Sequence, residues 1–133
     1  MDDTVLVHII DKEGNVKARV HAEMADTPAK RSMGLAKRAF LPSGYGMLFD
    51  KVGAYWMKDV EIPLDILFLD KQGTVLEKQH MEPDNDVSDW FNRTLYVPSS
   101  KEAELALELP AGWFDANGLA VGDKVIAKDS GQI

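Results

Sequence analysis

The chain has 133 residues, 45% of them hydrophobic, and its 22 acidic against 15 basic residues give a formal net charge of −7. This composition excludes wholesale disorder, the length fits one domain, and the acidic balance argues against nucleic-acid binding driven by net charge. The absence of cysteine excludes disulfides, thiolate metal sites and a cysteine nucleophile.

The first segment of the chain predicts a β-hairpin. Residues 5–10 are β-branched and almost wholly apolar, which indicates a strand covered on both faces. Gly14 in the following loop can take the positive φ that a short hairpin needs. Residues 16–24 then alternate strictly between apolar and polar side chains, which predicts a strand with one buried face.

A short helix is predicted next. Asp26 or Thr27 can cap its first amides, Pro28 suits the first helical position, and Gly34 can end it. The basic cluster of the chain lies in and just after this helix and comprises Lys30, Arg31, Lys37 and Arg38. We expect a solvated helix face there, with binding of a phosphate or another anionic partner as the alternative.

The rest of the chain is rich in short predicted strands. They cover residues 47–49, 64–69, 74–80, 101–109 and 121–127. The composition of residues 101–109 favours a helix, but their alternation predicts a strand, and residues 110–117 predict one or two helical turns. Closely spaced strands with two hairpins predict a mainly β fold, a compact single-domain sandwich or barrel with one or two short helices.

Several motifs occur in a distinctive order along the chain. They are Ala25–Pro28, Arg31, Gly34–Leu35, Gly46–Phe49, Trp56–Asp59, Ile62–Leu69, Leu107–Trp113 and Val121–Val125. Together they resemble the bacterial and archaeal family known as domain of unknown function 192 over residues 18–126. The resemblance implies a compact β fold of jelly-roll or barrel type and no established activity. We expect residues 1–133 to form one domain with a frayed tail at 128–133.

Five polar residues within or beside these apolar motifs form a candidate ligand pocket: Arg31, Lys58, Asp59, Asp65 and Glu108. A ligand site places its few orienting groups in such surroundings. Asp65 lies in a strand that should be buried on both faces, so its carboxylate needs a partner. Arg31 and Lys58 are the expected partners, in either a structural ion pair or a ligand or catalytic site. Trp56 and Trp113 are expected in the core.

Residues 82–93 form a candidate recognition loop, which departs from the usual pattern of the family. Four acidic residues stand there against Arg93 alone, and the singled-out residues are Asp84, Asp86, Asp89, Trp90 and Phe91. The alternating oxygen ligands resemble a calcium loop, but Asp89 replaces the required Gly and Leu95 the required Glu, so a solvated turn is expected. Trp90 and Phe91 are either loop anchors or an exposed hydrophobic contact for a partner or a sugar ring.

The sequence contains no recognisable catalytic motif. It lacks a glycine-framed serine, a phosphate-binding loop and a dinucleotide fingerprint, and its three histidines are too scattered for zinc. We therefore expect a monomeric, non-enzymatic module that binds an unknown protein or small molecule, or serves in an assembly, without metal, cofactor, nucleic acid or membrane span. The alternative is a small hydrolase or transferase that uses Asp65, with Lys58 or Arg31 as an anion clamp.

The N-terminus bears on the expected location. It is acidic and lacks the basic start and apolar stretch of a secretory leader. A cytoplasmic protein is expected for the sequence as written, and an envelope or exported one if a leader has been removed.

Overall fold

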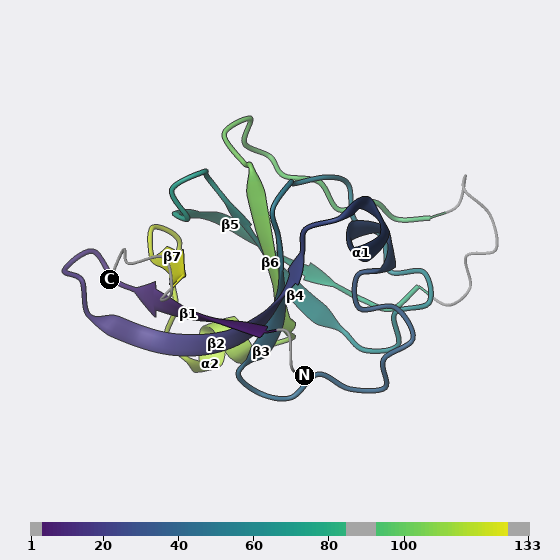
Figure 1. Ribbon diagram of the computed structural model, residues 1–133, viewed down its shortest axis with the longest axis horizontal. Coiled ribbons are helices and arrows are strands. Elements are labelled where there is room, and N and C mark those ends of the chain that lie inside the picture. The colour runs from purple at the N-terminus through teal and green to yellow at the C-terminus, as the bar shows by residue number, and fades with distance from the viewer. Residues whose placement is uncertain (1–3, 85–92, 128–133) are drawn as a thin grey trace.

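The computed structural model describes residues 4–84 and 93–127 and is mainly β (Figure 1). The elements in chain order are β1 (Thr4–Ile10), β2 (Val16–Ala25), α1 (Pro28–Met33), β3 (Tyr45–Phe49), β4 (Leu64–Leu69), β5 (Val75–Met81), β6 (Leu105–Pro110), α2 (Trp113–Ala116) and β7 (Lys124–Ala127). The predicted frayed tail, residues 128–133, lies outside the described residues.

The strands form one seven-stranded mixed sheet in the order β5-β4-β6-β3-β2-β1-β7. Strands β2 and β3 run parallel, while the other neighbouring pairs are antiparallel. Parallel neighbours cannot be joined by a tight hairpin, so a long connection, residues 26–44, links them and carries α1.

The two edge strands of the sheet, β5 and β7, meet at one end. Thr74 and Lys124 form an isolated bridge, Val75 N donates to the Asp123 carbonyl at 2.8 Å, and Val125 N donates to the Gly73 carbonyl at 2.8 Å. The sheet order does not pair β5 with β7 along their lengths, so this contact is confined to one end of the two strands. The predicted mainly β class with two short helices is confirmed, and the sheet is open and sandwich-like rather than a closed barrel.

Strand β4 separates two hydrophobic clusters, and all six of its residues are buried. Leu64, Ile66 and Phe68 belong to one cluster, which also contains residues of the connections before β4, such as Leu35 and Met57. Leu67 and Leu69 belong to the other cluster, with side chains from β1, β2, β6 and β7. The expectation that this strand is buried on both faces is therefore confirmed.

Local sequence signals form the predicted caps and turns. The Thr27 hydroxyl accepts a hydrogen bond from Lys30 N at 3.1 Å, Pro28 begins α1, and Gly34 ends it with a φ of 51°. The two hairpin turns, Asp11–Gly14 and Asp70–Gly73, are alike. In each, the aspartate Oδ1 accepts two backbone amides at 2.9–3.0 Å and the glycine has a φ of 88° or 89°.

Candidate functional site

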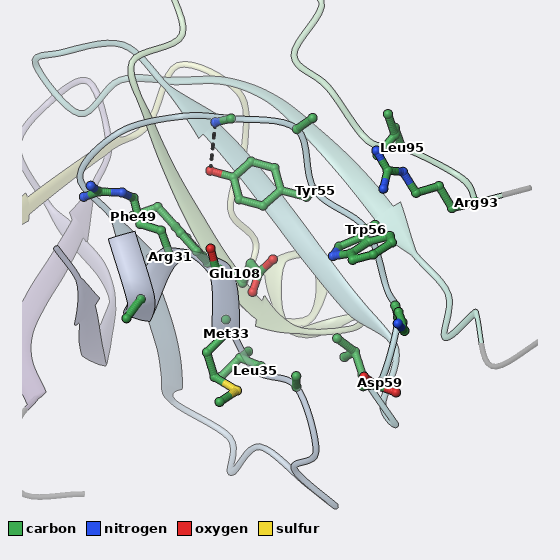
Figure 2. A pocket seen from close by; sticks show the side chains of 18 of the residues that line it. Arg31, Met33, Leu35, Phe49, Tyr55, Trp56, Asp59, Arg93, Leu95 and Glu108 are labelled. Atoms are coloured by element: carbon green, nitrogen blue, oxygen red, sulfur yellow. Dashed lines mark hydrogen bonds between the residues drawn. The ribbon is translucent and has the colours of Figure 1, made fainter. Parts of the chain in front are cut away.

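A pocket of about 810 Å³ lies between α1, the connections on either side of β3, and the chain at Arg93 and Leu95 (Figure 2). Arg31, Lys58, Asp59 and Glu108 all line it. The structure thus places four of the five predicted pocket residues around one cavity.

Glu108 lies on the floor of this pocket. It comes from β6, where Leu107 and Leu109 pack on the opposite face of the sheet, and its neighbours across the strands are Met47 and Ile66. The residue is 5% exposed, its carboxyl makes no hydrogen bond within the described residues, and its oxygens are not sealed from the pocket. Burial raises the pKa of Glu108 to about 8. At neutral pH the carboxyl is therefore mostly protonated and offers both a donor and an acceptor.

Aromatic side chains form a wall of the pocket. The Tyr55 hydroxyl accepts a hydrogen bond from Gly53 N at 3.3 Å, and burial raises its pKa. Its ring meets Phe49 edge to face at a centroid distance of 5.1 Å. The backbone of Tyr55 exchanges two hydrogen bonds of 2.8–2.9 Å with the backbone of Tyr96, and these hold Tyr55 in place. Trp56 follows and is half-buried, with the Arg93 guanidinium 4.5 Å from its ring centroid.

Basic side chains are in excess around the pocket. Five of them line it, against the acids Asp59 and Glu108; the five are Arg31, Lys37, Lys51, Lys58 and Arg93. Arg31 Nη1 lies 2.6 Å from Asp50 Oδ1, which ties the helix to the segment after β3. On a chain with a net charge of −7, this concentration of cations makes the pocket a local exception.

Two residues in the pocket wall have a left-handed backbone. Lys37 has a φ of 66° and Asp59 a φ of 63°, and they are the two non-glycine residues with positive φ in the described part of the chain. Lys37 N donates to the Asp59 carbonyl at 2.6 Å, so each holds the other in place. Such conformations are disfavoured and persist where the surroundings enforce them, commonly at ligand sites.

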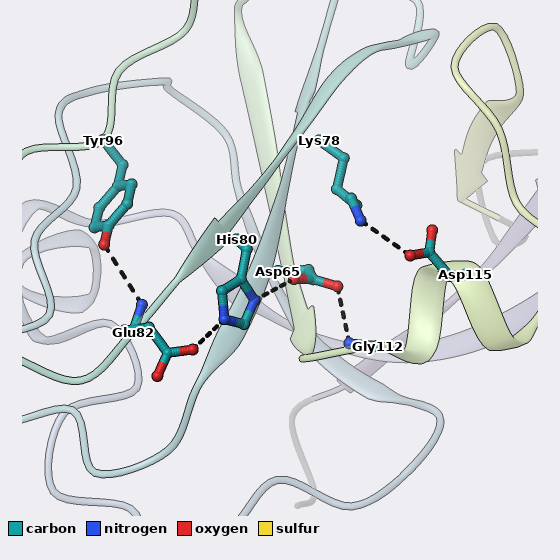
Figure 3. Close-up of polar contacts among 7 residues, drawn as sticks. All are labelled: Asp65, Lys78, His80, Glu82, Tyr96, Gly112 and Asp115. Carbon is teal, nitrogen blue, oxygen red and sulfur yellow. Dashed lines mark hydrogen bonds and ion pairs between the residues drawn. The ribbon is translucent and has the colours of Figure 1, made fainter.

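Asp65 is the predicted pocket residue that the structure places elsewhere (Figure 3). It is 1% exposed, its Oδ2 accepts from Gly112 N at 2.9 Å, and its Oδ1 lies 3.0 Å from His80 Nδ1. His80 contacts Glu82 through its other ring nitrogen, and these two carboxylates raise its pKa. The expectation that Arg31 and Lys58 pair with Asp65 is wrong, because Asp65 points to the face of β4 that carries Leu67 and Leu69.

The other predicted residues have separate positions. Asp84 Oδ2 accepts from Thr94 N at 3.4 Å. Asp86, Asp89, Trp90 and Phe91 lie outside the described residues. Within the basic cluster, Lys30 Nζ is 3.6 Å from Asp26, while Arg38 forms a two-pronged ion pair with Glu23 and lowers the pKa of that carboxyl. Arg31 and Lys37 are the members that line the pocket.

Sequence reasoning missed the aromatic wall. Trp56 was expected in the core but is half-buried at the pocket, next to Tyr55. The usable signal was the position of this aromatic pair in an irregular segment, between Gly53 and Lys58, rather than in a strand.

Within residues 4–84 and 93–127, no group of three or more histidine, aspartate or glutamate side chains is arranged to hold a metal ion. Neither α1 nor α2 has the length and apolarity that a membrane-spanning helix requires.

Comparisons with known proteins support the family resemblance that the sequence motifs indicated. No functionally curated protein matches the chain. A crystal structure from Sinorhizobium meliloti 1021, named as a candidate transcription regulator, shares 29% identity and a TM-score of 0.73, with 93% of each chain covered. A Novosphingobium aromaticivorans DSM 12444 protein of unknown function shares 27% identity and a TM-score of 0.75, covering 92% of this chain and 84% of its own. The family profile described as DUF192, Uncharacterized ACR, matches residues 8–127. The chain therefore belongs to the DUF192 family.

Proposed function

We propose that this protein is a binding module that holds a small organic anion in the pocket above Glu108. The observation that carries the proposal is the pocket itself, which combines five basic lining residues with the buried Glu108, whose carboxyl makes no hydrogen bond within the described residues. The pocket belongs to a protein that is acidic as a whole.

The shape and lining of the pocket support a small molecule as the ligand. Its volume of about 810 Å³ lies within the range of roughly 300–1,000 Å³ that is typical of small-molecule sites. Buried apolar and aromatic side chains, including Leu35, Phe49 and Tyr55, form much of the wall. A few charged groups at the edges of such a wall give orientation and specificity.

The charge distribution supports an anion. Cations that line a concave surface with low-dielectric walls focus the electrostatic potential into it and raise the local concentration of anions. Lys58 is exposed at the rim, where it can meet a carboxylate or phosphate as it enters. A cationic ligand would meet net repulsion from the same residues.

The position of the histidines favours binding over hydrolysis through a serine or a histidine base. Ser32 lines the pocket, but none of the three histidines of the chain is among the lining residues. A serine nucleophile needs a base within hydrogen-bond reach. Asp65, which the alternative hydrolase or transferase would use, lies outside the pocket.

The test is a titration of the 15N-labelled protein with cyclohexanecarboxylate and with its neutral analogue cyclohexylmethanol. The carboxylate should shift amide signals around residues 31–37 and 53–60 and bind more tightly than the alcohol. Lys58→Gln should weaken its binding about threefold, and Lys71→Gln, an exposed lysine on the 70–73 turn, should not. Equal binding of the two compounds, or shifts confined to other surfaces, would contradict the proposal.

A further inference from the structure

The Glu108 carboxyl makes no hydrogen bond within the described residues, and its oxygens are open to the pocket, so a molecule there must supply its partner. A buried carboxyl without a hydrogen bond is costly in either protonation state. Its side chain points into the pocket from the floor, toward the space between Tyr55, Trp56 and Leu35 (Figure 2). A ligand that fills this space completely must present a polar group to it.

The surroundings of Glu108 select the kind of group. An ammonium group would suit a carboxylate, but it would lie among five basic side chains. An apolar group would leave the carboxyl unpaired. A hydroxyl group carries no charge, and it can donate to an ionised carboxyl or accept from a protonated one. Hydroxyl groups therefore match this floor better than either alternative.

The wall next to Glu108 suits the apolar faces of a ring. Tyr55 is held between Phe49 and Phe68, at centroid distances of 5.1 and 6.0 Å, so its ring is a rigid surface. Trp56 continues this wall toward the rim, where Arg93 and Lys58 lie over its ring at 4.5 and 5.6 Å from the centroid and bring positive charge beside the aromatic surface. Aromatic faces pack well against the C–H groups of a saturated ring, while the hydroxyl groups at the ring edge remain free to hydrogen-bond.

Resting on the proposed function, we infer that the ligand is a polyhydroxylated carboxylic acid of the sugar-acid type. Its carboxylate lies among the basic side chains of the rim, its ring lies against the aromatic wall, and its hydroxyl groups hydrogen-bond Glu108 on the floor. Glu108 is thus the residue that distinguishes a hydroxylated anion from a hydroxyl-free one.

The experiment compares three probes on the full chain by the same NMR titration: D-glucuronate, cyclohexanecarboxylate and D-glucose. Glucuronate and cyclohexanecarboxylate share a six-membered ring with a carboxylate, so their difference reports the hydroxyl groups. Glucuronate should bind about fivefold to tenfold more tightly than cyclohexanecarboxylate, the gain expected from one or two net hydrogen bonds. Glucose should bind more weakly than glucuronate, because it has no carboxylate.

Two variants assign the preference to Glu108. Glu108→Leu should remove the preference for glucuronate, lowering the ratio of the glucuronate and cyclohexanecarboxylate affinities about fivefold to tenfold. Glu108→Gln, which keeps a donor and an acceptor, should retain the preference within about twofold. Glu104→Gln is the control, because Glu104 is exposed just before β6 and does not line the pocket. The amide spectra show whether each variant is folded.

The outcomes separate the two levels of the proposal. If both carboxylates bind the wild-type pocket equally well, the inference about hydroxyl groups is overturned while the anion site stands. If glucose binds as well as glucuronate, the anion site itself fails. These wild-type comparisons decide the question even if Glu108→Leu does not fold. A preference for glucuronate that survives in a folded Glu108→Leu variant would also overturn the role of Glu108.

Discussion

Replacing Glu108 by Gln should make the protein more stable at alkaline pH without changing its pH dependence below about 4.5. The folded protein holds a proton on Glu108 up to pH about 8, whereas the unfolded chain releases it near the ordinary value of 4.5. Between these values the folded state binds more protons than the unfolded state. Wild-type stability therefore falls as the pH rises through this window.

The size of the effect follows from the two pKa values. One pH unit corresponds to 1.36 kcal/mol, so the full separation amounts to about 5 kcal/mol, and at pH 7 about 3 kcal/mol of it has been lost. Gln resembles the protonated carboxyl in shape and hydrogen-bonding capacity and does not titrate. The free energy of unfolding of Glu108→Gln minus that of wild type should therefore increase by about 4 kcal/mol from pH 4.5 to 9.

The assay is urea denaturation of both proteins at intervals from pH 5 to 9. Taking the difference between variant and wild type removes the contributions of other titrating groups, His80 among them. Glu104→Gln, at an exposed site, should give a difference that is nearly flat with pH. A flat difference for Glu108→Gln would refute the reasoning, because it would mean that the carboxyl is ionised and well solvated in the folded pocket.

Three further predictions concern the scaffold and are read from denaturation midpoints. Gly73→Ala should destabilise the fold by about 2–3 kcal/mol more than Gly14→Ala. Both glycines have positive φ in similar turns, but a Cβ at residue 73 would collide with the Val125 carbonyl, whereas a Cβ at residue 14 would meet open space. Equal losses would contradict the importance of that contact. His80→Ala should cost about 1 kcal/mol of stability at pH 5.5 and less at pH 8.5. The folded state raises the pKa of His80, so its charged ring stabilises the fold below the ordinary value of 6.5, and this stabilisation is lost as the pH rises through the folded value. The opposite trend would contradict the role of its two carboxylate partners. Thr27→Ala should cost about 1 kcal/mol through the lost cap of α1, whereas Thr27→Ser should cost little, and equal losses would speak against capping.

Much of the fold was predictable from local patterns. Strict alternation located β2, a cap with a proline located α1, and two aspartate–glycine turns located the hairpins. Each of these signals acts within a few residues, where sequence spacing fixes geometry. The parallel pairing of β2 with β3 and the meeting of β5 with β7 depend on contacts between distant segments, for which spacing carries no information.

In the candidate site, too, local patterns were predictable from the sequence, whereas contacts between distant segments were not. Alternation along β6 placed Glu108 on the face opposite Leu107, but the sequence did not reveal that this face forms a pocket floor. Asp65 stood out for the same reason, as a carboxyl within a buried strand. Because β4 is covered on both faces, nothing local showed that Asp65 points away from Arg31 and toward His80.

The long connection between the parallel strands has a consequence for how this family can diversify. The topology requires chain between β2 and β3, and that obligatory stretch supplies Arg31 and Lys37 to the pocket. Doubling the length of such a loop costs only about 0.6 kcal/mol in closure entropy. Insertions and deletions there can therefore reshape the pocket mouth at little cost to stability, without altering the sheet or the position of Glu108 on β6.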